Sequence, residues 1–404
     1  MNQLYWIWLQ QILGCGSPVA DRVVKQGLSA KELYENREQQ LPFYEGLEAD
    51  LVKKLKESSL EQAEALLRRC QKLGIWVITI EDEDYPERLR NICPLPLLLY
   101  GKGERSLLNR KLLITMVGSR ECSKAGAHMA YDLAQDMVQY GFGVVSGLAM
   151  GIDSYCHTGA LEMGGLTIGV AACGLDRNYP TGNTELRRRI AEKGVLVSEY
   201  PPGMPVYPGN FHVRNRILSA LSLGTIVVEA RRGSGALITA DHALEQGRDV
   251  FAVPTHLYNH CGMGNLQLLA QGATPVISPE SVVEEYSAIY GDTMSTAIQS
   301  RLAIRRERGW KTKLQQERDA LTPVQPEKKH TKKTPAKPKE EFSPIPEGLD
   351  PSYEKILHIL EEKPLHAEEL ASRCGMEMQE LLVMLSELEI DGLVKAYPGK
   401  QFGR

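Results

Sequence analysis

The chain lacks several patterns that would assign it to a common class of protein. Its eight cysteines stand singly without a Cys-x-x-Cys pair, which excludes the usual zinc and disulfide frameworks and predicts reduced thiols in a cytoplasmic protein. No apolar run reaches membrane-spanning length and the start lacks a signal-peptide pattern, so we expect no membrane association. Positive charge is not in excess either. The formal net charge is -4, so any nucleic-acid site must be a local basic patch.

The motifs of nucleotide hydrolysis, dinucleotide binding and metal catalysis are also missing. No Gly-Lys-Ser/Thr follows a glycine-rich turn, and the first turn of the expected sheet is not GxGxxG, which disfavours ATP hydrolysis and NAD binding. The sequence contains neither GxSxG nor HExxH, and His256 and His260 have no evident third metal ligand. We therefore expect no catalytic residue, no metal and no cofactor.

Composition and periodicity divide the chain into four parts. Residues 1–75 read as a small helical domain of helix-hairpin-helix or SAM-like type, and residues 76–290 as a Rossmann-like domain. Residues 291–346 form a basic, proline-rich linker, because Lys and Arg number 13 against 5 Asp and Glu between positions 301 and 340. Residues 347–404 complete the chain with three helices and a hairpin, which predicts a winged helix-turn-helix domain.

The central part alternates short apolar runs with helix-length segments. We expect strands at 112–117, 144–145, 166–171, 195–198, 225–229 and 249–253. This spacing predicts an α/β fold with a right-handed, doubly wound parallel sheet. In such a sheet the carboxyl ends of the strands share one edge, which is where ligands bind.

The turns after these strands carry the residues that bind phosphate oxygens. Glycine lets a backbone approach closely, the start of a helix offers N–H groups, and arginine grips a phosphate with two hydrogen bonds. Several such phosphate-binding turns on one edge of the sheet suit a chain of phosphates better than a single nucleotide. The predicted groove residues are Gly118, Ser119, Arg120, Ser146, Gly147, Arg214, Asn215, Arg216, Ser234 and Gly235.

Other polar residues near this edge have simpler expected roles. Asp153 is expected to cap a helix, and most of the three consecutive arginines at 187–189 are expected to be solvated, because they cannot all face one ligand. Glu199 and Glu229 end strands and would be the catalytic acids of an alternative enzyme. The Gly-containing hairpin at 13–18 favours packing over contact with DNA.

The third helix of the C-terminal module is acidic. It carries Glu380, Glu387 and Glu389 and no arginine, whereas a helix that reads bases in the major groove needs Arg, Asn or Gln. The module is therefore expected to dock a protein or to touch DNA weakly.

Taken in order, the motifs of the central part resemble the DprA (Smf) family of DNA-processing proteins. The similar segments are Val117–Arg120, Val145–Asp153, Gly174–Asn183, Ser198–Tyr200, Phe211–Ile217, Glu229–Thr239 and Glu245–Pro254. The resemblance is strong over about residues 75–290, extends to the winged-helix end, and is loose at the N-terminus.

This resemblance implies a protein, not known as an enzyme, that binds single-stranded DNA, protects it, and helps to load RecA recombinase in natural transformation. It also implies a homodimer, and a DNA groove to which Phe211 contributes. The chain departs from the family pattern near Thr181, where some members place a lysine, and at Thr255, where the family usually has a glycine. The alternative is a Rossmann enzyme that hydrolyses the base–ribose bond of nucleoside monophosphates, for which Gly224–Glu229 is only a partial match.

Overall fold

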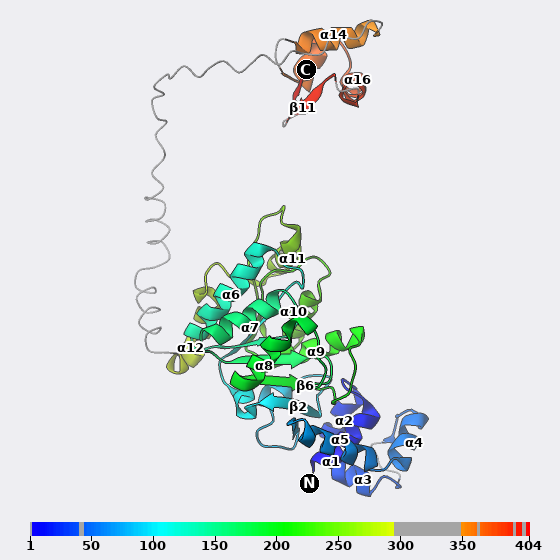
Figure 1. Cartoon of the computed structure of the whole chain (residues 1–404). Coiled ribbons are helices and arrows are strands. Elements are labelled where there is room, and N and C mark those ends of the chain that lie inside the picture. The colour runs from blue at the N-terminus through cyan, green and yellow to red at the C-terminus, as the bar shows by residue number, and fades with distance from the viewer. Residues whose placement is uncertain (1, 40–43, 295–348, 362–363, 391–392, 398–400) are drawn as a thin grey trace. The chain divides into compact units, whose positions relative to one another are not determined.

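The structure is a computed structural model that describes residues 2–39, 44–294, 349–361, 364–390, 393–397 and 401–404. Two compact units divide the chain, one ending at Gln316 and the other beginning at Glu317 (Figure 1). The first unit contains an N-terminal helical bundle and a large sheet covered by helices. The second contains the C-terminal helices and a small sheet. The predicted linker lies largely outside the described residues.

The described residues of the N-terminal bundle form five α-helices. Apolar residues of the first helix, among them Trp6, Ile7 and Leu9, are fully buried, which ties the bundle together around that helix. The capping box of Ser29 and Glu32 begins the third helix, because each side chain accepts a hydrogen bond from the other residue's backbone N–H. The helices are α1 (Gln3–Leu13), α2 (Val19–Lys25), α3 (Ala30–Glu35), α4 (Ala49–Glu57) and α5 (Glu61–Lys72).

The sheet of the first unit has nine strands in the order β1-β2-β6-β5-β4-β3-β7-β8-β9. The seven strands from β6 to β9 in this order are parallel to one another, as the alternating pattern predicts. The strands are β1 (Trp76–Thr79), β2 (Leu98–Gly103), β3 (Leu113–Val117), β4 (Gly143–Ser146), β5 (Thr167–Ala171), β6 (Val195–Ser198), β7 (Gly224–Val227), β8 (Asp249–Ala252) and β9 (Thr274–Pro275).

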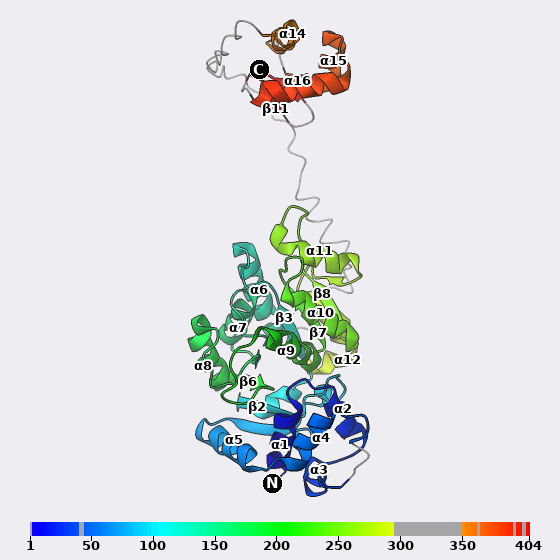
Figure 2. The same cartoon turned by 90° about the vertical axis from the view of Figure 1, so that its right-hand side faces the viewer.

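Helices cover both faces of the sheet (Figure 2). Side chains alternate along β3, so Ile114 and Met116 share a core with α6, α7 and α12, whereas Leu113 and Val117 share one with α9 and α10. These two cores explain why the central strands are mostly apolar and buried on both faces. The helices are α6 (Lys124–Gln139), α7 (Ile152–Glu162), α8 (Thr184–Lys193), α9 (Pro208–Leu221), α10 (Gly235–Glu245), α11 (Met263–Ala270) and α12 (Glu280–Tyr290).

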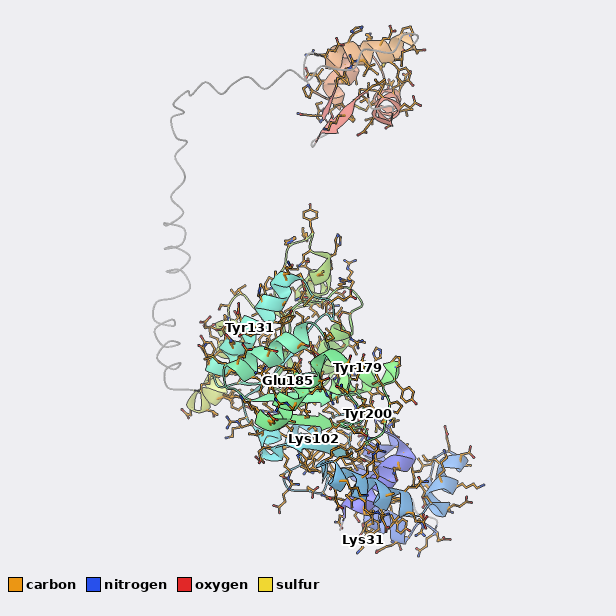
Figure 3. The ribbon with its side chains drawn as sticks, viewed as in Figure 1. Lys31, Lys102, Tyr131, Tyr179, Glu185 and Tyr200 are labelled. Atoms are coloured by element: carbon orange, nitrogen blue, oxygen red, sulfur yellow. The ribbon has the colours of Figure 1, made fainter. Side chains whose placement is uncertain are left out.

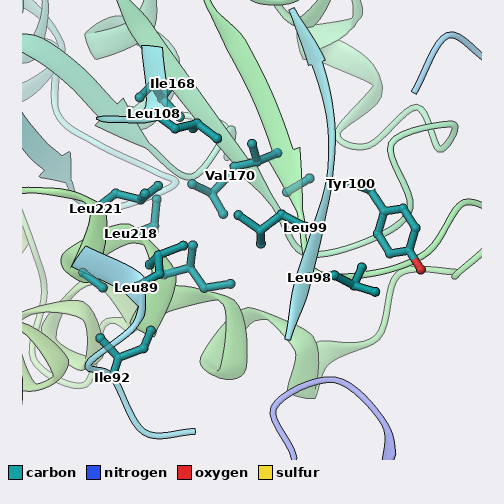
Figure 4. Close-up of a cluster of buried hydrophobic side chains, with 14 of the residues drawn as sticks. Leu89, Ile92, Leu98, Leu99, Tyr100, Leu108, Ile168, Val170, Leu218 and Leu221 are labelled. Carbon is teal, nitrogen blue, oxygen red and sulfur yellow. The ribbon is translucent and has the colours of Figure 1, made fainter. Parts of the chain in front are cut away.

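An antiparallel pair extends the sheet beyond its parallel part. β1 pairs with β2, and β2 pairs antiparallel with β6. The sequence pattern indicates β1 but not β2, because the residues before it read as a proline-rich approach. Leu98 and Leu99 of β2 lie in one buried cluster with Val170 of β5 and Leu218 of α9 (Figure 4). The pair therefore joins the helical bundle to the parallel sheet through a continuous core.

The hairpin between α1 and α2 packs against helix α9. Gly16 has a positive φ of 69°, and a Cβ added there would lie 2.5 Å from Cγ1 of Val213. Its N–H donates to Oε1 of Glu199 at 3.1 Å, and Glu199 in turn accepts two hydrogen bonds at 2.8 Å from Nη2 of buried Arg216. The N–H of Gly16 is thus used inside the protein, which favours the packing role over contact with DNA.

The described residues of the second unit form three helices and a three-stranded sheet, in agreement with the predicted winged helix-turn-helix fold. Gly375 ends the second helix in the left-handed conformation that glycine adopts most readily. On the third helix Leu382 and Val383 are exposed, together with Glu380 and Glu387. The elements are α14 (Pro351–Leu360), β10 (Leu365–His366), α15 (Ala367–Cys374), α16 (Met378–Ile390), β11 (Lys395–Tyr397) and β12 (Gln401–Gly403). None of the helices in the described part of the chain has the length and hydrophobicity needed to cross a bilayer.

Gly16→Ala is expected to reduce the free energy of unfolding by about 2–3 kcal/mol. The new methyl group would clash with Val213, and alanine is also strained at a positive φ. Gly27→Ala is the matched control. Gly27 has a φ of 66° with no atom near its Cβ position, so only the backbone cost of about 1 kcal/mol remains. Chemical denaturation of the two variants measures the difference, and equal losses would show that the hairpin does not pack on α9.

Candidate nucleic-acid interface

A cleft of about 220 Å³ lies at the carboxyl ends of the central strands. β3 and β7 are neighbours in the sheet although they begin its two halves, so the cleft lies where the strand order reverses, the usual ligand position in such folds. The cleft is lined by Val117, Gly118, Arg120, Ala149, Asp153, Phe211, Arg214, Asn215, Leu218, Ser234, Gly235, Ala236 and Thr239. Six of the predicted groove residues, together with Phe211, are therefore brought together.

Arg120 supplies an exposed positive charge at the mouth of the cleft. It follows β3, and its guanidinium carbon lies 4.6 Å from the centroid of the Phe211 ring, which holds the side chain by a cation–π interaction. Phe211 belongs to the first turn of α9 and is partly exposed. Arg120 is therefore held in position while its hydrogen-bond donors remain accessible to a ligand.

Gly118 is required by the close packing at the end of β3. A Cβ at this position would lie 2.5 Å from Cγ1 of Ile152 and 2.7 Å from the carbonyl oxygen of Glu229. No side chain fits without a shift of the backbone. The strand end therefore presents only main chain to the cleft.

Arg214 forms the floor of the cleft and is 5% exposed. Its Nη1 donates to the carbonyl oxygen of Gly147 at 2.7 Å and to that of Val170. Burial lowers the pKa of Arg214 to about 10, an effect opposed chiefly by the nearby Asp153 carboxylate. Asp153 accepts hydrogen bonds from the N–H groups of Gly147 and Ala149, and its pKa is raised by burial. Arg214 and Asp153 thus hold the turn after β4 in place.

The start of helix α10 closes the other side of the cleft. The Ser234 hydroxyl caps the helix by accepting from the N–H of Ala236, and Asn215 donates its amide to the carbonyl oxygen of Gly235 at 3.2 Å. The positive end of the 11-residue helix is therefore oriented toward the cleft, as expected for a phosphate site.

Four predicted residues lie elsewhere or have other partners. Ser119 is 7% exposed, and the fully buried Ser146 donates its hydroxyl to the carbonyl oxygen of Met116. The Gly147 N–H donates to Asp153, and Arg216 is 1% exposed beneath the N-terminal hairpin. We leave these four out of the proposed contact surface, because their polar groups have partners within the fold or are buried.

Tyr179 and Thr239 were not among the residues predicted for the site. Thr239 lines the cleft, and the Tyr179 ring lies 5.8 Å from the Phe211 ring at an interplanar angle of 60°. Tyr179, labelled in Figure 3, also lines an outer pocket of about 510 Å³ with Arg120, Phe211 and His212. The sequence shows the Tyr-Pro motif at this position, but it gives no indication that the Tyr179 ring packs beside the Phe211 ring.

The acidic residues of the alternative enzyme have structural partners. Glu199 forms the buried ion pair with Arg216, and Glu229 accepts hydrogen bonds from the N–H and hydroxyl of Ser123 at the start of α6. The prediction that Asp153 caps α7 is wrong, because the N-cap residue of that helix is Gly151. The Asp153 carboxylate instead accepts a hydrogen bond from the N–H of Gly147 in the preceding turn. No metal-binding group of His, Cys, Asp or Glu is present among the described residues.

Comparison with known proteins finds the family that the sequence motifs resemble, both over the sheet and over the C-terminal unit. The family described as DNA recombination-mediator protein A matches residues 76–287, and the DprA winged helix domain matches residues 339–400. Protein Smf of Synechocystis sp. is 30% identical over 100% of this chain and 99% of its own length. DNA processing protein DprA of Bacillus subtilis is 40% identical over 54% of this chain and 74% of its own length.

A solved structure agrees with these sequence matches. The X-ray structure of DNA processing protein A from Streptococcus pneumoniae aligns with a TM-score of 0.61 and 32% identity. It covers 70% of this chain and 97% of that chain. The arrangement of the sheet is therefore shared with a relative of related sequence.

The different burial of the two cleft arginines predicts a large effect on stability at Arg214 and a small one at Arg120. Arg214→Met is expected to reduce the free energy of unfolding by about 3 kcal/mol, because it leaves two carbonyl groups without this donor and removes the positive charge near Asp153. Arg120→Met is expected to change it by no more than about 0.5 kcal/mol, since that guanidinium is exposed. Chemical denaturation without DNA measures both, and a small effect at Arg214 would contradict its structural role.

Proposed function

The chain belongs to the DNA recombination-mediator protein A family, and from this premise we propose that it binds single-stranded DNA in the cleft. In this proposal the protein acts in the cytoplasm during natural transformation, where it protects the strand and helps to load RecA recombinase. The observation that carries the proposal is the combination of an exposed arginine, a helix start and a pair of aromatic rings at one strand edge.

Each of these groups has a counterpart in a single strand. Arg120 and the start of α10 match backbone phosphates, which occur in any nucleic acid. Phe211 and Tyr179 offer ring faces on which an unpaired base can stack, and such stacking requires bases that are not already in a duplex. The cleft is therefore best suited to single strands and to binding without sequence preference.

We also propose a homodimer that retains these clefts. Support comes from exposed apolar side chains around a shallow pocket between α6 and β9, where Met129 is 41% and Ile277 is 56% exposed. Leu257 and Tyr258, which follow Pro254 of this pocket in the chain, are 73% and 85% exposed. Exposed apolar side chains around such a pocket favour a protein interface over solvent.

The alternative function is hydrolysis of the base–ribose bond of nucleoside monophosphates. It requires an acidic residue that can reach a substrate, and the engagement of Glu199 and Glu229 with structural partners argues against it. We therefore propose a binding protein and not an enzyme. Release of a base from a nucleoside monophosphate by the purified protein would support the alternative.

Titration of a fluorescent oligonucleotide tests the proposed function. Single-stranded DNA is expected to bind more tightly than a duplex, and affinity is expected to fall steeply with salt because phosphate contacts release counterions. Arg120→Ala is expected to weaken binding by about ten-fold or more. Arg68→Ala is the control, since Arg68 is an exposed arginine on α5 paired with Glu64. Equal affinity for single-stranded and duplex DNA, or an affinity that does not depend on salt, would contradict the proposal.

The second unit is expected to be dispensable for this binding. Its third helix exposes acidic and apolar side chains, whereas the cleft and the apolar surface lie in the first unit. A chain shortened to end at Met294, which is buried against α12, should remain dimeric and keep most of its affinity for single strands. Light scattering and the same titration check this. A folded, dimeric shortened chain without affinity would show that the cleft is not the main DNA site.

A further inference from the structure

A second, smaller pocket shares Arg120 and Phe211 with the first cleft. It has a volume of about 50 Å³. The turn at 147–150 and Tyr179 contribute to its wall, and Arg187 completes it. Since about 10–15 Å³ holds one water-sized group, the space suits a group with about four oxygens.

Arg187 enters this pocket from helix α8. It is 6% exposed, although it stands in a run of three arginines that the sequence suggests are mostly solvated. Its Nη1 donates to the carbonyl oxygen of Tyr179 at 3.2 Å, and its Nη2 donates to that of Arg177 at 3.3 Å. The guanidinium is therefore fixed beside the Tyr-Pro turn and does not extend into solvent.

The second pocket has an unbalanced positive charge. Two arginines line it, and its described lining contains no Asp or Glu, whereas Asp153 lines the first cleft. Burial lowers the pKa of Arg187, and no carboxylate opposes this effect. A buried cation without a negative partner is costly, and an incoming anion would supply that partner.

We propose that the second pocket is a phosphate subsite in which Arg187 and Arg120 bind the phosphodiester next to the one held in the first cleft. This inference rests on the proposed binding of single-stranded DNA. Arg120 lines both spaces, so a strand that passes over the Arg120–Phe211 pair places neighbouring phosphates on its two sides. The ligand chemistry is an extended phosphodiester chain of at least two phosphates, which a mononucleotide does not supply.

Adjacent arginines on α8 provide the test. Arg187→Gln in the full-length chain is expected to weaken single-strand binding by about ten-fold. The same change should reduce the magnitude of the salt slope by about 0.7, the value for one phosphate contact on a single strand. Arg188→Gln removes the same charge from an exposed residue that pairs with Glu185 and Glu192, and is expected to change affinity less than about two-fold. Glu185, labelled in Figure 3, marks that side of the helix.

An uncharged linkage in the DNA distinguishes a direct contact between Arg187 and a phosphate from a loss of local protein structure in the variant. Oligonucleotides with one uncharged methylphosphonate at successive positions are titrated against the wild type and Arg187→Gln. One linkage is expected to weaken the wild type about ten-fold and the variant hardly at all, because the contact is already missing. Arg187→Lys retains the charge and should recover most of the affinity that the glutamine variant loses.

The outcomes separate this inference from the proposed function. If the wild type binds single strands with the expected salt dependence, but every neutral linkage weakens wild type and variant equally, Arg187 does not bind phosphate. Loss of affinity in the lysine variant as severe as in the glutamine variant would also overturn the subsite. If the wild type itself shows no salt-dependent preference for single strands, the proposed function fails.

Discussion

One turn of helix α9 holds the first unit together at the point where a ligand would bind. Its four residues from Val213 to Arg216 point to four different partners: the N-terminal hairpin, the ends of β4 and β5, the start of α10, and Glu199. Two of the four are buried guanidiniums, and a buried charge is tolerated only with close partners. The helical bundle, the turn after β4 and α10 are therefore positioned by the same helix turn.

This arrangement separates arginines that maintain the cleft from arginines that can act on a ligand. Arg214 donates to carbonyl oxygens inside the protein, and Nη2 of the buried Arg216 donates to the Glu199 carboxylate. Arg120 is exposed and supported by an aromatic ring, so its donors face outward. Because the chain has a net charge of -4, attraction of a polyanion depends on where such cations gather and not on the overall charge. Substitution of Arg214 or Arg216 would lower affinity indirectly, by loosening the cleft.

The sequence predicts the parallel sheet well, because each of its main strands is an apolar run followed by a helix-length segment. β2 escapes detection since Leu98 and Leu99 follow several prolines, and its strand character depends on pairing with β1 and β6. The candidate site is predicted in outline, since the turns after β3 and β7 both reach the cleft. Periodicity cannot decide which arginine is buried. Arg187, Arg188 and Arg189 are consecutive residues of the same type, yet packing of α8 buries only the first of them.

A small number of accessible cations limits how tightly one cleft can hold DNA. Each charge-assisted contact contributes roughly 1.5–3 kcal/mol, and part of that offsets the entropy lost when a flexible strand is ordered. In the proposed homodimer a strand that reaches both clefts would bind the second one without a second loss of translational freedom. The affinity for long strands would then exceed that for short oligonucleotides by more than the added contacts explain. Such a length dependence would follow from the proposed binding of an extended strand by two clefts.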